Sequence, residues 1–408
     1  MRVEEARRIV EGEAKTLDSM EIRVEESLGY VLGEDIMAPI PLPIFDNSAM
    51  DGYAIRSEDS LGAKEGNPIS FRIIGESRAG NPFLGKVGPF EAVGIGTGAQ
   101  IPEGADAVIE IEEVEVIGET IRIRNNVERW RNIRMRGEEI AEKEVVLRKG
   151  EVMTPGRIAL LSALGIERIS VTRQPNVSIV VTGEEVVPPG IPLLPGRIYD
   201  SNTPFLSSSL LEMGIKPRAV RLVGDSEGNI RAAIEEAIED SDLLIITGGV
   251  SVGKTDLVKY ILEEKLGARR LIWRVQQRPG HPFYFAILDG KPVFGLPGNP
   301  AAVAVCFYLY LYPFLNKMRG AEGGLREAKA IFLGRFKKKA GLAYFLRVKV
   351  EETGEGLKAT PLRWQGSNMI ASIAYADGMA YIPEELETVD PETEVDLFLF
   401  PSYLLKAR

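Results

Sequence analysis

The residues with the clearest chemical meaning lie in a glycine-rich stretch between an apolar run and a helical pattern. The run at 243–246 is Leu-Leu-Ile-Ile, residues 248–253 read Gly-Gly-Val-Ser-Val-Gly, and apolar residues then recur at the three- to four-residue spacing of a helix. Exposed backbone N–H groups in such a loop, with the positive end of the helix dipole behind them, form a binding site for an anion. We therefore expect an anion to bind here, although a plain strand-to-helix turn has the same pattern.

The same stretch matches the P-loop pattern of nucleotide-binding proteins from Gly248 to Thr255. A P-loop enzyme that hydrolyses nucleotides needs a second strand that ends in an aspartate, which helps to hold magnesium. The best candidate, Asp289, is followed by Gly290 and a further apolar run, which is typical of a hairpin turn. Asp256 also adds negative charge beside the loop. Both observations argue against nucleotide hydrolysis, and a P-loop-type nucleotide-binding protein is kept as an alternative.

Carboxylate side chains follow three predicted strands of one sheet. Glu185 comes after the apolar strand at 177–181, Asp225 follows the strand at 218–223, and Asp256 follows the glycine-rich loop. Parallel strands end at the same edge of a sheet, so these acids are expected to meet there. Each acid alone could be a helix cap or a solvated loop residue. Because carboxylate oxygens beside an anion site are suitable ligands for Mg²⁺, their common position predicts a magnesium site formed by Glu185, Asp225 and Asp256.

A second constrained loop, Arg-Pro-Gly-His-Pro at 278–282, contains the single histidine of the chain. Its two prolines restrict the backbone, so Arg278 and His281 are held in position at little further entropic cost. A zinc site is not expected, because there is no second histidine and the single cysteine, Cys306, lies in an apolar run. We predict that Cys306 is a core residue.

Size and composition limit the class of protein. A chain of 408 residues is expected to form about three domains. Its formal net charge of −10 argues against a general nucleic-acid binder. One cysteine excludes a disulfide framework, and the first residues lack the apolar core of a signal peptide. The apolar run at 301–315 is too short to span a membrane and contains Pro313, so it predicts a buried helix and a candidate subunit interface. We expect a cytoplasmic protein with no nucleic-acid or membrane partner.

The first part of the chain indicates a helical domain that is interrupted by a β domain. Residues 1–20 have the spacing of an amphipathic helix, and 23–33 suggest a second, short helix. Alternating prolines at 39, 41 and 43 favour extended chain that leads into short strands separated by Gly and Pro, with Gly118-Glu119 as a hairpin turn. Helical spacing returns at 152–164. We predict a discontinuous helical domain, 1–45 and 139–172, around an inserted β domain, 46–138.

The second part alternates strands with helices, which is typical of a doubly wound parallel sheet. We place this α/β domain at 173–326, with an Asp-Gly hairpin between apolar runs at 283–288 and 292–296. Strand patterns dominate again afterwards and predict a small C-terminal β domain at 327–408. The expected fold class is therefore α/β plus β, with several domains.

The motifs together resemble the molybdopterin molybdenumtransferase family of the MoeA type, which is related to the E domain of gephyrin. The resemblance spans nearly the whole chain, and its motifs occur in the same order. They are FDNSAMDGYA at 45–54, GTGA at 96–99, RGEE at 136–139, TGEE at 182–185, YDSN at 199–202, GGVSVG at 248–253, LPGNP at 296–300 and QGS at 365–367.

The resemblance implies a reaction of molybdenum cofactor biosynthesis. Adenylylated molybdopterin and molybdate, or tungstate, would give the metal-containing cofactor and AMP, with Mg²⁺ assisting. It implies an α/β domain that binds molybdopterin, and a homodimer whose site lies in a cleft between subunits. Asp51 of one subunit would then face the sheet residues of the other. A molybdopterin adenylyltransferase is a possible partner, because it would make the substrate.

The resemblance also assigns site residues. The expected catalytic positions are Asp51, Glu185, Asp225 and Asp256, of which the last three are the metal ligands named above. The expected substrate-binding positions are Thr97, Glu139, Thr182, Gly248, Gly249, Ser251, Gly253, Arg278, His281, Pro297, Gly298, Asn299, Pro300 and Ser367. Ser251 and the glycine loop would hold the phosphate on the pterin side, and Thr97, Arg278 and Ser367 would guide the metal oxyanion.

The chain departs from the usual family motifs at two positions that affect chemistry. Glu139 stands where an aspartate is usual, so the charge is kept on a longer side chain. His281 stands where a lysine is usual, which predicts that binding of the oxyanion depends on pH. Two alternatives related to the family stay open, a molybdopterin adenylyltransferase and a gephyrin-like scaffold. The adenylyltransferase would not need the additional helical and β domains, and the scaffold would not need Asp51, Glu185, Asp225 and Asp256 together.

Overall fold

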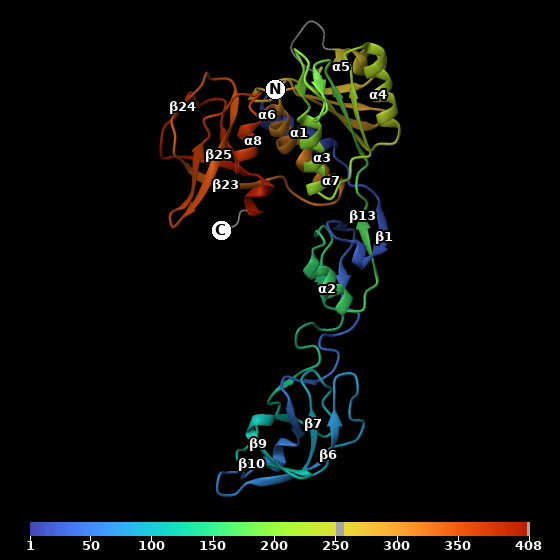
Figure 1. Ribbon diagram of the computed structural model, residues 1–408, viewed down its shortest axis with the longest axis vertical. Helices are drawn as coiled ribbons and strands as arrows, with labels where there is room; N and C mark the ends of the chain where they lie inside the picture. Colours follow the sequence, from blue (N-terminus) through green and yellow to red (C-terminus); the bar gives the residue numbers. More distant parts are fainter. Residues whose placement is uncertain (250–256, 406–408) are drawn as a thin grey trace.

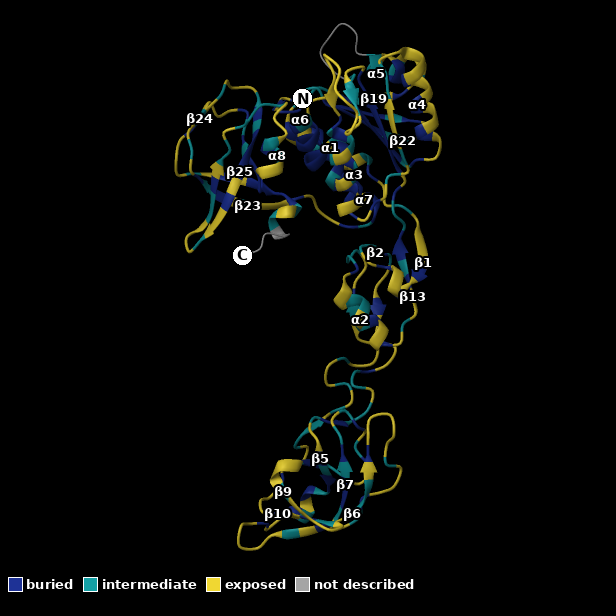
Figure 2. Ribbon diagram, viewed as in Figure 1, coloured by how far each residue is buried: buried dark blue, intermediate teal, exposed yellow. Residues whose placement is uncertain are grey.

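The computed structural model describes residues 1–249 and 257–405. The chain is elongated: a β region lies at one end, and an α/β region and a C-terminal barrel lie side by side at the other (Figure 1). A small middle region joins the two ends. The chain between the β region and the middle region is mostly exposed or half-buried, whereas buried residues concentrate in the sheets and in the central helix of the α/β region (Figure 2).

The β region is built on a six-stranded sheet with the order β8-β5-β7-β6-β10-β9. The predicted turn at Gly118-Glu119 is confirmed, since Ile117 pairs with Thr120 across it. The short strands β4 and β11 pair in a separate two-stranded ladder. The strands are β4 (Asn47–Ser48), β5 (Gly52–Ile55), β6 (Ile69–Ser77), β7 (Glu91–Ile95), β8 (Ala107–Glu110), β9 (Val114–Ile117), β10 (Thr120–Ile123) and β11 (Ile133–Arg134), with short 3₁₀ turns η2 (Ser57–Ser60) and η3 (Ile111–Glu113).

The middle region contains more strand than the sequence suggested. The helix predicted at 152–164 is present at Pro155–Ala163: Pro155 opens it, and the Thr154 hydroxyl caps it by accepting from the Arg157 N–H at 3.4 Å. The predicted helix at 23–33 is wrong, because the Ser27 hydroxyl bonds back to the Val24 carbonyl and Gly29 turns the chain with φ +79°. The elements are β1 (Ser19–Arg23), η1 (Val24–Glu26), β2 (Val31–Leu32), β3 (Ile36–Met37), β12 (Val145–Leu147), α2 (Pro155–Ala163) and β13 (Arg168–Thr172).

The α/β region has a six-stranded sheet with the order β17-β14-β18-β22-β21-β19, covered by helices on both faces. The first four strands in this order are parallel, and β21 is antiparallel to both of its neighbours. This confirms the doubly wound α/β fold. The elements are α1 (Val3–Glu13), β14 (Val177–Thr182), β15 (Val186–Val187), β16 (Ile198–Tyr199), α3 (Asn202–Glu212), β17 (Ala219–Val223), α4 (Glu227–Glu239), β18 (Leu243–Thr247), α5 (Leu257–Tyr260), η4 (Ile261–Lys265), β19 (Arg269–Trp273), β21 (Tyr284–Leu288) and β22 (Lys291–Leu296).

The domain boundaries given above stay a prediction, but the structure shows where the first helix packs. The first helix, α1, packs its buried residues Val3, Ala6 and Val10 into the main core of the α/β region, away from the middle region. Its amphipathic face is therefore satisfied by the helices that follow much later in the chain.

The predicted Asp-Gly hairpin joins β21 and β22. Asp289 and Gly290 both have positive φ, +50° and +78°, as a two-residue hairpin turn requires. Asp289 therefore turns a hairpin and does not stand at the carboxyl end of a parallel strand, where a P-loop enzyme would need it.

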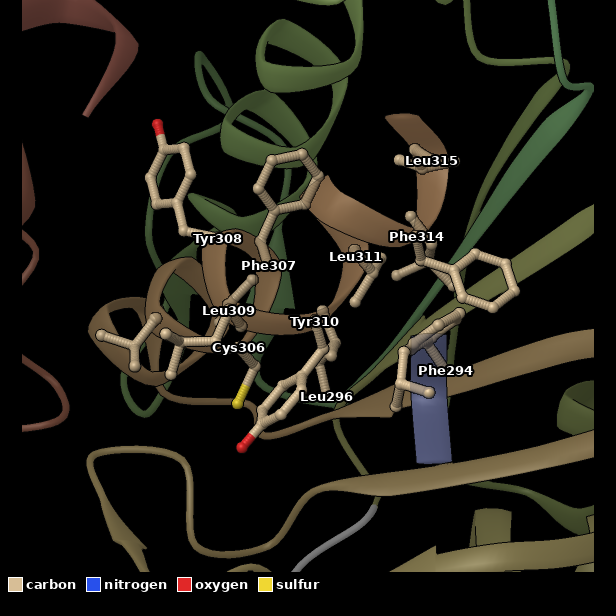
Figure 3. Close-up of a cluster of buried hydrophobic side chains, with 14 of the residues drawn as sticks. Phe294, Leu296, Cys306, Phe307, Tyr308, Leu309, Tyr310, Leu311, Phe314 and Leu315 are labelled. Carbon is tan, nitrogen blue, oxygen red and sulfur yellow. The ribbon is translucent and has the colours of Figure 1, made fainter. Parts of the chain in front are cut away.

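The apolar run at 301–315 forms the centre of the largest core (Figure 3). It belongs to a continuous helix made of α6 (Pro300–Cys306), a wider π-helical segment η5 (Phe307–Leu311) and α7 (Tyr312–Met318). Pro313 has no N–H to donate, and the π-helical segment before it makes room for its ring. Cys306 is fully buried, as predicted.

Burial within its own chain leaves this helix little surface for the subunit interface that was considered from the sequence. Within the described residues, Pro300–Met318 is one helix long and apolar enough to span a membrane, but 83% of it is buried inside the molecule. Its side chains pack against α1, α3 and the sheet of the same chain, so they are not available to a second copy.

The C-terminal barrel closes because β25 pairs with both β26 and β27. Strand β20 comes from the α/β part of the sequence and joins the barrel beside β25, which attaches the barrel to the α/β region. The elements are β20 (Gln277–Arg278), β23 (Arg326–Phe332), β24 (Phe336–Lys337), β25 (Ala343–Thr353), β26 (Gly356–Pro361), α8 (Ala371–Tyr375), β27 (Gly378–Ile382), β28 (Thr388–Val389), β29 (Thr393–Leu399) and η6 (Pro401–Leu405).

The aromatic packing in the core predicts a stability effect. Phe294 is fully buried, and its ring lies 4.6 Å from Phe285 and 5.1 Å from Phe314, measured between centroids. Phe294→Ala should lower the free energy of unfolding by about 3–5 kcal/mol, because it leaves a cavity that rigid neighbours cannot fill. Urea denaturation followed by circular dichroism measures this. Leu61→Ala, at a side chain that is 70% exposed, should change it by less than about 0.5 kcal/mol. Equal effects of the two changes would contradict this view of the core.

Candidate active site

A cavity of about 990 Å³ lies at the carboxyl ends of the parallel strands. Four strands contribute to its wall through the residues that follow them, as expected for an open α/β sheet. The lining residues predicted from the sequence are Thr182, Glu185, Asp225, Gly248, Gly249, Pro297, Gly298, Asn299 and Pro300.

The two described glycines of the loop are required by the close approach of the chain. Gly248 has φ +89°, and a Cβ there would lie 2.3 Å from the carbonyl oxygen of Thr182. Gly249 has φ +64°, and a Cβ there would lie 2.6 Å from a methyl group of Val258. At Gly248 no other residue type fits without moving the backbone, and at Gly249 a side chain would displace Val258 and adopt an unfavourable positive φ. The predicted site residues Ser251, Gly253 and Asp256 lie outside the described residues.

Carboxylates border the cavity without cationic partners. Glu184 and Asp225 tie the ends of β14 and β17 together, because each backbone N–H donates to the other residue's carboxylate at 3.3 Å. Glu185 and Asp225 line the cavity. In the part of the chain that the structure describes, neither forms an ion pair, so their negative charge is balanced by no neighbouring side chain.

These carboxylates fit Mg²⁺ as hard oxygen ligands. Within residues 1–249 and 257–405, no group of three acidic, histidine or cysteine side chains is arranged to hold a metal ion. The described residues therefore include two of the predicted metal ligands at the cavity, Glu185 and Asp225. The third predicted ligand, Asp256, lies outside the described residues.

The cavity wall also includes a stretch, residues 199–202, that was not predicted to be part of the site. Residues 199–202 border the cavity, and Asp200 holds them in place by accepting from the N–H groups of Asn202 and Thr203 at 3.0 Å. The Asn202 amide donates to the Gly298 carbonyl at 2.9 Å and to the Thr247 hydroxyl at 3.2 Å. The motif YDSN was visible in the sequence, but nothing in it showed that the motif meets the ends of β18 and β22.

Two polar atoms of the cavity wall are buried and unpaired among the described residues. They are the Thr182 hydroxyl and the side-chain oxygen of Asn202. An unpaired buried polar atom costs about 1–3 kcal/mol, and such atoms gather where a ligand completes the hydrogen bonds. The polar floor of the cavity is therefore suited to a ligand with its own donors and acceptors.

The C-terminal barrel contributes a further wall. Asn299 donates to the Ser367 hydroxyl at 3.1 Å, and the Ala301 N–H donates to the Ser367 carbonyl at 3.0 Å. The next residue, Asn368, lines the cavity. The predicted residue Ser367 therefore lies against the predicted stretch 297–300.

A buried arginine that the sequence analysis missed supports this wall. Arg347 is 1% exposed and donates to the Gly366 carbonyl at 3.2 Å, to the Phe345 carbonyl at 2.9 Å and to the Ser372 hydroxyl at 3.1 Å. Burial lowers the pKa of its guanidinium to about 10, so the group stays protonated at neutral pH. An arginine inside a strand pattern gives no sequence signal of this kind.

Arg278 and His281 are near the cavity but do not line it. Arg278 is exposed and donates to the Tyr344 hydroxyl at 3.3 Å. His281 is half-buried, and its Nδ1 lies 2.7 Å from the Val275 carbonyl oxygen. A carbonyl oxygen only accepts, so Nδ1 carries the proton of this hydrogen bond. The next residue, Pro282, borders the cavity.

Asp51, Thr97 and Glu139 are not brought to the cavity by their own chain. Asp51 and Thr97 lie in the β region, and Glu139 lies in the exposed connection between the β region and the middle region (Figure 1). One oxygen of Asp51 accepts from the Thr97 N–H at 2.7 Å and from the Thr97 hydroxyl at 2.9 Å. These bonds, the backbone one first, lower the pKa of Asp51 below its ordinary value.

Comparisons with known proteins cover nearly the whole chain. Three family models match: the MoeA N-terminal region (domain I and II) at 1–165, the probable molybdopterin binding domain at 178–317, and the MoeA C-terminal region (domain IV) at 329–400. A molybdopterin molybdenumtransferase of Staphylococcus aureus is 36% identical over 401 residues, which are 98% of this chain and 96% of that protein. The enzyme of the same name from Staphylococcus epidermidis is 36% identical over 385 residues, 94% of this chain and 92% of that protein. The crystal structure of a molybdopterin biosynthesis MoeA protein from Pyrococcus horikoshii has a TM-score of 0.84 at 34% identity and covers 98% of both chains.

The contact between Asp51 and Thr97 predicts a measurable titration. Thr97→Val removes the hydroxyl donor and keeps the backbone donor, so the pKa of Asp51 should rise toward its ordinary value. NMR titration of the carboxyl carbon measures it, with Thr97→Ser as the control that retains a hydroxyl. An unchanged pKa in the valine variant would show that the hydroxyl does not stabilise the carboxylate.

Proposed function

Because the chain belongs to the molybdopterin molybdenumtransferase family of the MoeA type, and is thus a transferase of molybdenum cofactor biosynthesis, we propose that it inserts molybdate or tungstate into adenylylated molybdopterin and releases AMP with the help of Mg²⁺. The observation that carries the proposal is the cavity at the strand ends, in which a glycine turn meets carboxylates that have no cationic partner in the described parts of the chain.

The described residues suggest how the substrate is held. The pyrophosphate of adenylylated molybdopterin would lie at the glycine turn, where backbone N–H groups bind anions. The Thr182 hydroxyl and the Asn202 oxygen would pair with polar groups of the ligand. Glu185 and Asp225 would hold Mg²⁺, which, when bound, neutralises the charge on the phosphate oxygens and on the leaving AMP.

Without that metal, the same carboxylates would repel the pyrophosphate. The role of Glu185 and Asp225 is therefore in the breaking of the phosphate anhydride bond more than in capture of the substrate. Ser367, at the edge of the cavity, and Arg278 would guide the incoming oxyanion.

The position of Asp51 supports a homodimer as the active form. Asp51 is held by two hydrogen bonds from Thr97 in the β region, and this region lies at the other end of the molecule from the α/β region (Figure 1). If the β region of one subunit reaches the cavity of the other, both subunits complete each other's site. A closed two-fold dimer allows this for both sites at once.

The substrate must come from an enzyme that adenylylates molybdopterin, so we propose a molybdopterin adenylyltransferase as a functional partner. A reducing, cytoplasmic environment is in line with a single, fully buried cysteine.

Asp225→Asn should separate chemistry from binding. The variant should bind adenylylated molybdopterin at least as tightly as wild type, because repulsion falls. It should release AMP about 10- to 100-fold more slowly in a single turnover with molybdate and Mg²⁺. The control is Asp240→Asn, at an acid that follows α4 at the other end of the sheet and pairs with Arg218. AMP release at the wild-type rate would remove Asp225 from the catalytic residues.

Mixed dimers should test the composite site. Asp51→Asn and Asp225→Asn should each have at most about a tenth of the wild-type activity, but a mixture of the two chains should recover roughly a quarter of it. Random pairing makes half of the dimers mixed, and each mixed dimer has one intact site of two. A mixture of Glu185→Gln and Asp225→Asn should recover none, because both residues come from the same half of the site. A wild-type chain that is monomeric by light scattering at micromolar concentration would contradict the proposal.

A further inference from the structure

Two short segments connect the middle region to the α/β region. Residues 14–18 run from α1 to β1, and residues 173–176 run from β13 to β14. The buried apolar residues of the two regions form separate clusters, one around Leu161 and Val171, the other around the central helix. Their relative angle therefore depends on the contacts of these two connecting segments more than on a shared core.

The second segment is held by a bidentate ion pair between Arg173 and Asp242. The guanidinium of Arg173 donates to both carboxylate oxygens of Asp242, each at 2.7 Å. Asp242 lies directly before β18, and one of its oxygens also accepts the Asn176 N–H at 2.8 Å. The Arg173 N–H in turn donates to the Asp18 carbonyl at 3.0 Å, so the pair is also linked to the first segment.

The two parallel hydrogen bonds restrict the relative orientation of the Arg173 and Asp242 side chains as well as the distance between them. A planar guanidinium that meets a carboxylate with two parallel hydrogen bonds fixes the orientation of both groups, whereas a lysine would fix only their separation. The pair is partly buried, with 31% and 21% of the side chains exposed. Burial alone would raise the pKa of Asp242, but the hydrogen bonds from Arg173 and Asn176 more than offset this and lower it. The carboxylate thus stays charged at neutral pH.

The other polar contacts at the junction are weaker in direction: the Gln174 amide donates to the Gly29 carbonyl of the middle region at 3.5 Å, and Gly320 lies close to the Thr172 side chain of β13. In the first segment, the Leu17 N–H donates to the Met318 carbonyl at 2.8 Å and the Thr16 hydroxyl donates to the Lys317 carbonyl at 3.2 Å. Both are single, uncharged hydrogen bonds about which the segment can rotate.

We propose that Arg173 and Asp242 are a positioning pair that fixes the angle at which the middle region leaves the α/β region, and through it the place of the β region with Asp51 and Thr97. The inference rests on the proposed composite site for its functional consequence. A small rotation at the junction displaces the far end of an elongated chain by much more than it displaces the junction itself. A misplacement of about 1 Å at reacting groups can cost about a hundredfold in rate.

The first experiment measures the angle directly. Spin labels at Leu84→Cys in the β region and Ala232→Cys on α4 report the distance between the two ends of the chain; both positions are exposed, and the native Cys306 is buried. Labelled full-length chain is diluted with unlabelled chain so that pairs within one chain dominate. Arg173→Met and Asp242→Asn should broaden or shift the distance distribution. Arg173→Lys should change it less.

The control breaks a similar pair within one region. Arg270 meets both oxygens of Glu263 at 3.1 Å, and both residues belong to the α/β region. Arg270→Met should leave the distance distribution at its wild-type width. A distribution that is unchanged in Arg173→Met and Asp242→Asn would overturn the proposal.

The second experiment links the angle to catalysis. In Arg173→Met, the rate of AMP release should fall about tenfold or more, while the affinity of the cavity for adenylylated molybdopterin stays within about twofold, because no residue of the α/β wall is changed. Arg173→Lys should recover part of the rate. A broadened distribution with an unchanged rate would overturn the positioning role. Absence of activity in the wild type would contradict the proposed function instead, and the distance measurement would still decide whether the pair sets the angle.

Discussion

The close approach of strand ends at the edge of one sheet is the constraint on which the rest of the site depends. Gly248 comes so near to the carbonyl of Thr182 that no side chain fits between them. This contact aligns the ends of β14 and β18, and the amide of Asn202 then joins β18 to the residues after β22. Glycines, carboxylates and residues with unpaired polar atoms consequently line one cavity, although they come from segments more than a hundred residues apart.

The charged side chains around this cavity have no oppositely charged neighbours among the described residues. Glu185 and Asp225 stand at its edge without cationic partners among the described residues, and Arg347 lies behind the Ser367 wall without a carboxylate partner in the same set. Both acids are exposed, so water solvates them in the free protein, and two acids at one cavity are suited to bind a hard cation. Under the proposed function, a pyrophosphate bound with a divalent cation would complement the acids.

Under the proposed function, the elongated shape divides the chemistry between two ends of the chain. Asp51 and Thr97 are ordered by their own hydrogen bonds, so they do not depend on the cavity for their geometry. Their proposed contribution to catalysis depends instead on how rigidly the β region is held by the rest of the chain. That rigidity comes from a few polar contacts at narrow connections, since the regions have separate cores. Under the proposed mechanism, the positions of the regions are as important as the residues they carry.

Local patterns in the sequence were sufficient for most features that depend on near neighbours. The Asp289-Gly290 and Gly118-Glu119 turns, the α2 helix and the alternation of strands and helices were predictable, because turn chemistry and periodicity act over a few residues, whereas the helix predicted at 23–33 was wrong. The motifs also identified the family, since several specific strings occur in the same order. Sequence alone did not reveal that Asn202 meets Gly298, that Arg347 supports the Ser367 wall or that α1 packs with the α/β region. These contacts join distant segments, and only the folded chain decides which of them meet. The same holds for the helix from Pro300 to Met318. Its apolar surface predicted that it is buried, but only the tertiary structure showed that the residues covering it belong to the same chain.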